Sequence, residues 1–226
     1  MKQIRTIAFT GFIVALGLGK VYSQCTVSKN SQGEIITTCG KRICKGSEYL
    51  NFPVWQTGTI NIDGRGQSLY GQLAFNVLED KVLFRLTTDT TQIITSHPVE
   101  FTINNERFTI LPFTILGMTQ YLYCAGLYEG KTKLFRHTTC NFRTTGVDNG
   151  YTAAGSDGSW GYYETRQEYF IQKNNGPLKQ ILLTRKSLLH GLKGKAAKSD
   201  ARFSKGLLTI DQAIELLTYY DNLPTQ

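Results

Sequence analysis

The chain has 226 residues, of which 41% are apolar and 12% aromatic, with 22 glycines and five prolines. A chain of this length and apolar content forms a core of its own, which excludes a mainly disordered protein and suits one large domain. The 25 basic and 17 acidic residues give a formal charge of +8 at pH 7.

Residues 1–23 have the pattern of a secretory signal peptide. Lys2 and Arg5 form a basic start, the run from Thr6 to Gly19 carries no charge, and small or moderate residues precede Gln24. The run is short for a membrane span and has the flanks of a cleaved leader. We therefore predict an exported protein that is periplasmic, associated with the outer membrane or secreted, with no transmembrane span in the mature chain.

All five cysteines follow the expected leader, in a compartment where pairing is the default. Cys124 and Cys140 flank a turn and are predicted to pair across a hairpin or its neighbouring strand. Cys39 and Cys44 enclose four residues, which permits a small disulfide loop. A Cys39–Cys44 disulfide would leave Cys25 without a partner. Alternatively, Cys25 pairs with Cys39 or Cys44, or it carries a lipid, although Gln24 before it is unlike a lipoprotein signal.

Residues 24–48 are predicted to form a cysteine-bearing arm, and residues 49–184 an antiparallel β domain. Turn signals recur at about the 8–12-residue spacing of a sandwich or barrel, and Asn104–Asn105 separates two alternating runs. No alternation of strands with helices is visible, which excludes a parallel nucleotide-binding sheet. We predict a mainly β protein, an antiparallel sandwich or barrel-like sheet with a C-terminal helical segment. Strands are expected at 59–62, 69–77, 81–86, 92–96, 99–103, 107–111, 120–127, 133–137, 162–172 and 180–184.

Residues 144–161 contain five glycines and are predicted to form a long exposed loop. Exposed Trp and Tyr on β scaffolds recognise sugars or peptides through their flat rings. The candidate binding residues are Tyr151, Asp157, Trp160 and Tyr162. The alternative is that the aromatic residues from Tyr162 onward belong to the core of a strand.

Residues 185–226 are predicted to form a helical segment that packs on the β domain. Thr209 and Gln212 have the spacing of a capping box, and apolar residues follow at helical spacing from Ile210 to Leu217. A second, weaker helix is expected over residues 186–198.

Basic residues are concentrated in the segment from Lys173 to Lys205. This segment contains nine basic residues and a single acidic one, Asp200. Removal of Lys2, Arg5 and Lys20 with the leader leaves 22 basic against 17 acidic residues in the mature chain. The segment 173–205 is predicted to contact an anionic surface, or to be an ordinary solvated helix face. Nucleic acid is not expected as a partner, because few aromatic residues are interleaved and the chain is exported.

Catalytic signals are weak. The best acidic group is Asp148, Asp157, Glu164 and Glu168 around the long loop, and it is also typical of a solvated rim. The three histidines and the Cys39–Cys44 pair lack the spacing of a metal site, and no cofactor is expected.

Several short motifs resemble those of uncharacterised exported β-rich proteins of the Bacteroidetes type. They span most of residues 50–222. The motifs are Phe52-Pro53-Val54-Trp55 with Gly58-Thr59-Ile60, Leu73-Ala74-Phe75-Asn76, Lys81-Val82-Leu83-Phe84, Phe101-Thr102-Ile103 with Phe108, Tyr128-Glu129-Gly130-Lys131, Phe170-Ile171-Gln172-Lys173 and Leu217-Thr218-Tyr219-Tyr220-Asp221. The resemblance implies an exported β protein and carries no activity or catalytic residue.

The function predicted from these patterns is that of a non-enzymatic ligand-binding or envelope-associated protein. One alternative is a secreted hydrolase acting on glycans or esters, which requires the acidic residues to converge with a histidine. A second alternative is a purely structural envelope component, which would associate along an open sheet edge.

Overall fold

The computed structural model describes residues 25–62, 64, 68–87, 94–148, 151–155, 158–192 and 206–223. The leader predicted for residues 1–23 lies outside these residues, as do Asp157 and the part of the basic segment from 193 to 205.

Fifteen strands and two helices lie within the described residues. They are β1 (Cys25–Lys29), β2 (Ile35–Cys39), β3 (Arg42–Lys45), β4 (Gln56–Asn61), β5 (Leu69–Asn76), β6 (Lys81–Arg85), β7 (Ile94–Ser96), β8 (Glu100–Ile103), β9 (Glu106–Ile115), β10 (Met118–Glu129), β11 (Thr132–Thr144), β12 (Gly146–Asp148), β13 (Tyr151–Ala153), β14 (Gly161–Lys173), β15 (Lys179–Ile181), α1 (Arg185–Leu192) and α2 (Ile210–Asp221).

Thirteen of the strands form one sheet in the order β1-β2-β3-β14-β11-β10-β9-β8-β4-β5-β6-β7, with β15 beside β14. Neighbouring strands are antiparallel except β3 and β14, which run parallel. The predicted fold class, mainly β with a C-terminal helical segment, is confirmed. Among the described strands the two outermost, β1 and β7, do not pair with each other, so the sheet is open and not a closed barrel.

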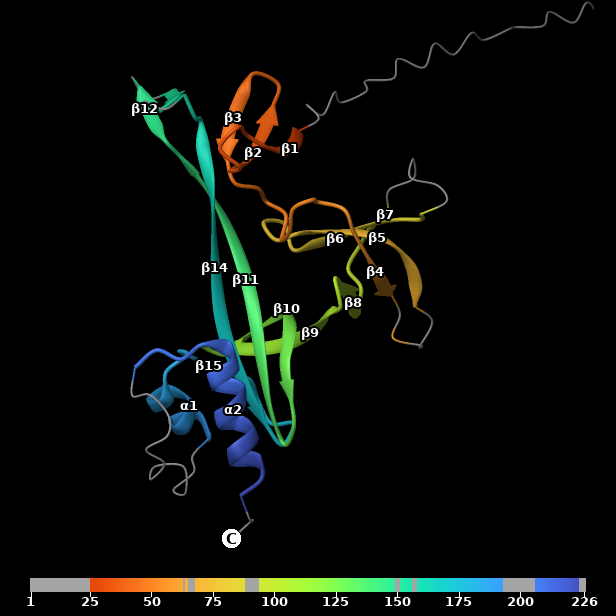
Figure 1. The fold of residues 1–226 in the computed structure, drawn as a ribbon, viewed down its shortest axis with the longest axis vertical. Coiled ribbons are helices and arrows are strands. Elements are labelled where there is room, and N and C mark those ends of the chain that lie inside the picture. Colours follow the sequence, from red (N-terminus) through yellow and green to blue (C-terminus); the bar gives the residue numbers. More distant parts are fainter. Residues whose placement is uncertain are drawn as a thin grey trace, which may run out of the picture.

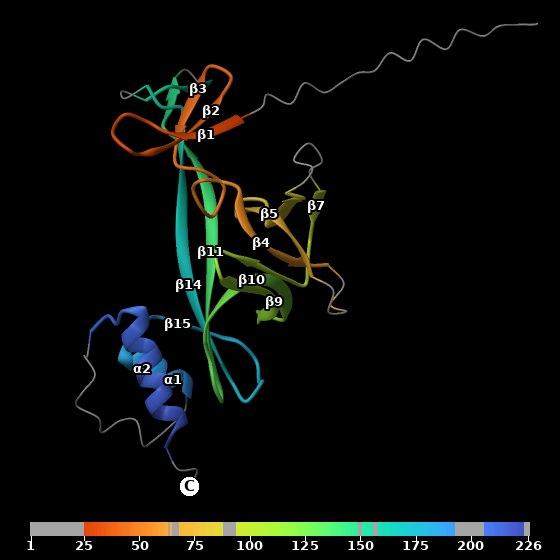
Figure 2. The same cartoon turned by 45° about the vertical axis from the view of Figure 1, so that its right-hand side comes forward.

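The long strands β11 and β14 form a ribbon that organises the molecule. They pair over thirteen consecutive positions, from Thr132 opposite Lys173 to Thr144 opposite Gly161. At about 3.3 Å per residue the ribbon spans roughly 40 Å. Both views place α1 and α2 at one end of the ribbon, β1–β3 at the other, and β4–β9 to one side (Figures 1 and 2).

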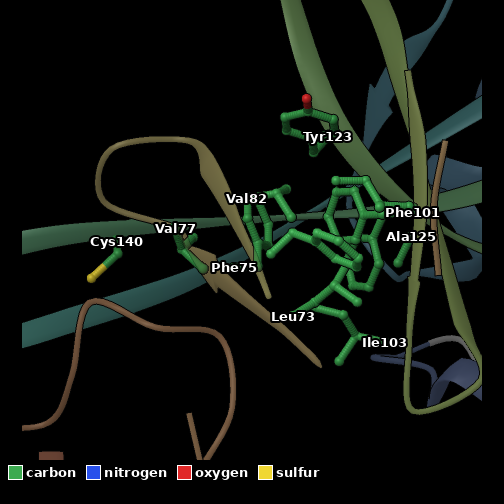
Figure 3. Close-up of a cluster of buried hydrophobic side chains, with 12 residues drawn as sticks. Leu73, Phe75, Val77, Val82, Phe101, Ile103, Tyr123, Ala125 and Cys140 are labelled. Carbon is green, nitrogen blue, oxygen red and sulfur yellow. The ribbon is translucent and has the colours of Figure 1, made fainter. Parts of the chain in front are cut away.

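The largest core joins strands that are not neighbours in the sheet. The Phe75 ring on β5 lies 5.6 Å from that of Tyr123 on β10, although β4, β8 and β9 separate these strands in the sheet order. The Phe101 ring contacts both of these rings, with centroids 5.2 Å from Phe75 and 5.3 Å from Tyr123 (Figure 3). Phe101 also stacks on Phe108, with centroids 4.8 Å apart. The Phe75–Tyr123 contact requires the sheet to curl, and alternate residues of each strand supply the inner face.

The two helices cover one face of the ribbon. Leu134 and Ile171 of the ribbon are buried against Leu188 of α1 and Leu217 of α2. Gly191 of α1 lies close to Ile171, because a Cβ added there would meet the end of the Ile171 side chain. The predicted cap of α2 is present, with Thr209 and Gln212 each accepting a hydrogen bond from the other's backbone N–H.

The opposite face of the ribbon carries a smaller core. Phe135 follows Leu134 and therefore points to the other side of the strand, where it packs with Cys124, Phe170 and Leu178. The Phe113 ring of β9 lies 4.9 Å from that of Phe170 on β14, so the β9–β10 hairpin folds across this face.

Two segments are more ordered than the sequence indicated. The predicted arm at 24–48 contains the three antiparallel strands β1, β2 and β3. The predicted loop at 144–161 contains β12 and β13, which pair in a separate two-stranded sheet.

Candidate binding surface at the end of the ribbon

The end of the ribbon that carries β1–β3 extends beyond the rest of the sheet. The last pair between β10 and β11 joins Cys124 to His137, whereas β11 continues to Thr144. Residues 141–144 of β11 are all exposed. This end is therefore accessible to a partner, in contrast to the helix-covered end (Figure 1).

Strand β3 joins the ribbon through a short parallel contact, in which Gly161 lies opposite Cys44 and Tyr162 opposite Lys45. The Trp160 backbone N–H donates a hydrogen bond to the Ile43 carbonyl over 2.8 Å. The β1–β3 sheet is thereby held against the start of β14, next to the predicted binding residues.

Trp160 is half-buried and has a cation over its ring. The Arg42 guanidinium lies 4.7 Å from the ring centroid, which is within the range of a cation–π interaction. One face of the indole is therefore covered by this chain's own Arg42, and Trp160 is not an open platform on both faces.

Tyr162 is exposed and lies between cations on both neighbouring strands. It is directly opposite Arg143 on β11 and Lys45 on β3, so these side chains emerge from the same face. Glu164 and Arg166 follow on that face at intervals of two residues. We call the set Lys45, Arg143, Tyr162, Glu164 and Arg166 the distal surface.

Glu164 organises the cations of the distal surface. Its carboxylate accepts a 2.8 Å hydrogen bond from Arg166 and lies 3.5 Å from the Arg143 Nε atom. The hydrogen bond from Arg166, with further contributions from its charge and from Arg143, lowers the pKa of Glu164. Glu164 is thus an ionised acceptor that positions two guanidinium groups, each more than half exposed.

The structure describes less of the other two predicted binding residues, Tyr151 and Asp157. Tyr151 lies on β13 opposite Asp148, and only the backbone of these two residues is described. Asp157 lies outside the described residues. The structure therefore brings together Trp160 and Tyr162 from the prediction, and adds the cations of β3 and β11 that sequence reasoning did not select.

A partly buried cluster of polar side chains and thiols underlies the distal surface on the opposite face of the ribbon. The Tyr163 side chain hydrogen-bonds Glu48, and burial followed by the Glu48 charge raises the pKa of Tyr163. Burial also raises the pKa of the Cys44 and Cys140 thiols, which keeps both thiols protonated at neutral pH. Unreactive buried thiols of this kind serve packing.

The disulfide differs from the two pairings that the sequence favoured. Cys25 lies opposite Cys39 in the β1–β2 ladder, and their sulfur atoms form a disulfide bond. The predicted Cys39–Cys44 loop is therefore wrong, since Cys44 lies opposite Thr37. Cys25–Cys39 was one of the pairings left open for Cys25.

Cys124 and Cys140, predicted to pair, are both unpaired and buried. Cys124 lies opposite His137, and Cys140 is three residues farther along β11. An odd offset places the two side chains on opposite faces of the sheet. Accordingly, Cys140 belongs to the core of Phe75 and Cys124 to that of Phe135, where burial raises the pKa of Cys124 to about 12.

The acidic group does not form a single catalytic cluster in the described residues. Glu164 pairs with arginines, whereas Glu168 lies opposite His137. His137 is buried, with Nδ1 2.9 Å from the Tyr123 carbonyl oxygen. Glu164 and Glu168 are four positions apart on one strand, about 13 Å, which exceeds the ~5–9.5 Å between the paired carboxylates of glycosidases.

The described cations of the basic segment mainly contact the helices. Lys173 donates to the Tyr220 hydroxyl over 2.7 Å, and Lys179 lies 3.4 Å from the Gly191 carbonyl at the end of α1. An apolar groove of about 490 Å³ at α1 is lined by Leu182, Thr184, Lys186, Ser187, Leu189 and His190.

In the part of the chain that the structure describes, neither helix is both long and apolar enough to cross a membrane. No group of three or more His, Cys, Asp or Glu side chains is arranged there to hold a metal ion.

A scan against protein-family models gave no match, and searches of curated proteins and of solved structures gave none either. The resemblance to exported β-rich proteins of the Bacteroidetes type is tested by none of these comparisons and stays a prediction.

Proposed function

We propose that this chain is an exported, non-enzymatic binding protein of the cell envelope, and that the distal surface holds an anionic glycan. The observation that carries the proposal is the position of Tyr162, an exposed ring with Arg143 opposite it and Arg166 on the same face of the ribbon. A flat aromatic ring packs against a sugar, and guanidinium groups bind carboxylates through paired hydrogen bonds.

Two observations support export. The first is the leader pattern of residues 1–23. The second is the Cys25–Cys39 disulfide, because disulfides are typical of an oxidising compartment. Its first cysteine, Cys25, lies two residues after the expected cleavage site. The disulfide ties β1 to β2, and the next strand of the sheet, β3, supplies Lys45 to the distal surface.

The alternative of a secreted hydrolase is less well supported by the geometry. A hydrolytic acid needs a carboxyl group with a raised pKa near a second carboxylate. Glu164 has the opposite property, because its arginine partners lower its pKa. A recognition role uses the same ion pairs directly, since they hold the guanidinium groups in place before a ligand arrives.

Affinity electrophoresis through gels that contain polygalacturonate, with neutral dextran as the comparison polymer, tests the proposal. We expect the wild-type chain to be retarded by polygalacturonate only, and Tyr162→Ala and Arg143→Gln to lose most of the retardation. Arg107→Gln is the matched control, because Arg107 and Arg143 have the same side-chain exposure of 55% and each pairs with a glutamate. Equal loss in Arg143→Gln and Arg107→Gln, with the retardation of Tyr162→Ala unchanged, would indicate attraction by net charge and would contradict a specific site.

A further inference from the structure

The tip of the β9–β10 hairpin exposes several apolar side chains. Ile115 and Met118 form the last pair of the ladder, and Leu116–Gly117 connects them. Leu116 is 92% exposed, and Ile115, Met118 and Tyr121 are exposed as well. A Cβ added to Gly117 would meet no described atom within 4 Å, so the tip projects away from the described part of the protein.

The residue at this turn contradicts local preference. Leu116 and Gly117 have φ values of 49° and 79°, the positive pair of a type I′ turn, for which Asn-Gly is favoured. Every other non-glycine residue at positive φ in the described chain is Asn or Asp. A leucine in this conformation is unfavourable, and at 92% exposure Leu116 gains almost no packing from the described part of the chain, which points to a contact with another molecule.

The composition of the hairpin favours a lipid environment. Between Arg107 and Glu129 the sequence contains no charged residue. The polar side chains near the tip are neutral, and Thr114 and Thr119 hydrogen-bond each other over 3.0 Å. Aliphatic residues occupy the extreme end and Tyr121 lies a few residues back, an order that matches the position of tyrosine at membrane interfaces.

The size of the tip argues against a protein partner. Ile115, Leu116, Met118 and Tyr121 are 44%, 92%, 62% and 63% exposed. At ~200 Å² for a fully exposed large side chain, these fractions leave on the order of 500 Å² in all. Each partner of a standard protein interface buries about 800 Å². The tip is therefore too small for a stable dimer of this chain through this contact alone, whereas interfacial anchoring needs only a few apolar side chains.

The backbone of the tip permits shallow insertion. The ladder is continuous up to the Ile115–Met118 pair, so the facing N–H and C=O groups are satisfied within the hairpin. The outer edges of β9 and β10 at the tip require water or headgroups, because unpaired backbone groups are not tolerated in the hydrocarbon core. We infer that Ile115, Leu116, Met118 and Tyr121 insert into the interfacial layer of a lipid bilayer. This inference concerns a surface separate from the distal surface.

Flotation with lipid vesicles tests the inference. The chain that begins at Gln24 is used, since the apolar leader would itself bind lipid. Vesicles are made of phosphatidylcholine alone, and of phosphatidylcholine and phosphatidylglycerol in equal parts. We expect the chain to float with both, at low and high salt, because a neutral tip does not depend on headgroup charge.

Leu116→Asn separates binding from folding. Asparagine suits a type I′ turn, so the variant should keep or raise the urea midpoint of unfolding while its partition into vesicles falls about tenfold. Leu207→Asn is the matched control, because Leu207 is 81% exposed and lies outside the hairpin, and its partition should not change.

Three results would overturn the inference: no flotation of the wild type, equal flotation of Leu116→Asn and the wild type, or flotation only with anionic vesicles at low salt. The last result would assign lipid binding to the basic segment 173–205. None of them bears on the retardation by polygalacturonate, so the failure of this inference is distinguishable from failure of the proposed function.

Discussion

Asp221, the last residue of α2, is predicted to hold the helical segment on the ribbon. Its side chain is buried, and Oδ2 accepts hydrogen bonds from the Thr132 backbone N–H over 2.9 Å and from the Tyr128 hydroxyl over 3.1 Å. Thr132 is fully buried, so Asp221→Ala leaves its N–H without an acceptor. An unsatisfied buried donor costs about 1–3 kcal/mol, and with the lost tyrosine bond we expect a total of about 3 kcal/mol.

Urea unfolding, followed by circular dichroism, measures this loss. With a urea dependence of about 2–3 kcal/mol per M, the midpoint should fall by about 1 M. Asp221→Asn keeps an acceptor oxygen for Thr132 and should cost only about 1 kcal/mol. Glu215→Ala, an exposed position on the same helix, should change stability by less than about 0.5 kcal/mol. A midpoint for Asp221→Ala equal to that of Glu215→Ala would refute the reasoning.

Three further predictions concern the disulfide, a half-buried acid and the helix cap. Non-reducing peptide mass spectrometry should find Cys25 linked to Cys39, with the other three thiols alkylated only after denaturation; any other linkage contradicts the β1–β2 register. Burial raises the folded-state pKa of Asp80, so stability should fall as the pH rises above the carboxyl's unfolded pKa, and Asp80→Asn should remove that slope in urea titrations at several pH values. Thr209→Ala should lower the free energy of unfolding by about 1 kcal/mol, whereas Thr209→Ser should not.

Features determined by neighbouring residues could be predicted from the sequence. The Asn104–Asn105 turn has two positive φ values and joins β8 to β9, as the alternating runs on either side indicated. The cap of α2 was visible in the spacing of Thr209 and Gln212. Turn and cap chemistry depends on residues a few positions apart, which explains this success.

The end of the ribbon could not be predicted in the same way. The strand expected at 133–137 continues to Thr144, and its last four residues are all exposed. A ribbon that is exposed on both faces lacks the alternation of apolar and polar residues by which strands are recognised. The pairing of Tyr162 with Lys45 joins residues more than a hundred positions apart, and no local pattern indicates such a contact.

The cysteine pairing shows the same limit. Cys39 has Cys44 nearby in sequence, but the register of β1 and β2 places Cys25 directly opposite it. Register depends on which residues face each other across the turn at 30–33, where the Asn30 side chain accepts from the Glu34 backbone N–H over 2.9 Å. Sequence separation alone favours the shorter loop and does not contain this information.

Hydrogen–deuterium exchange with and without a galacturonate oligomer tests the proposed function most directly, because it locates the ligand on the chain. We predict slower exchange in peptides that cover residues 141–144 and 161–166, and no such protection in Tyr162→Ala. Protection confined to the β9–β10 hairpin or to the groove beside α1, or none at saturating ligand, would contradict a binding site at the distal surface.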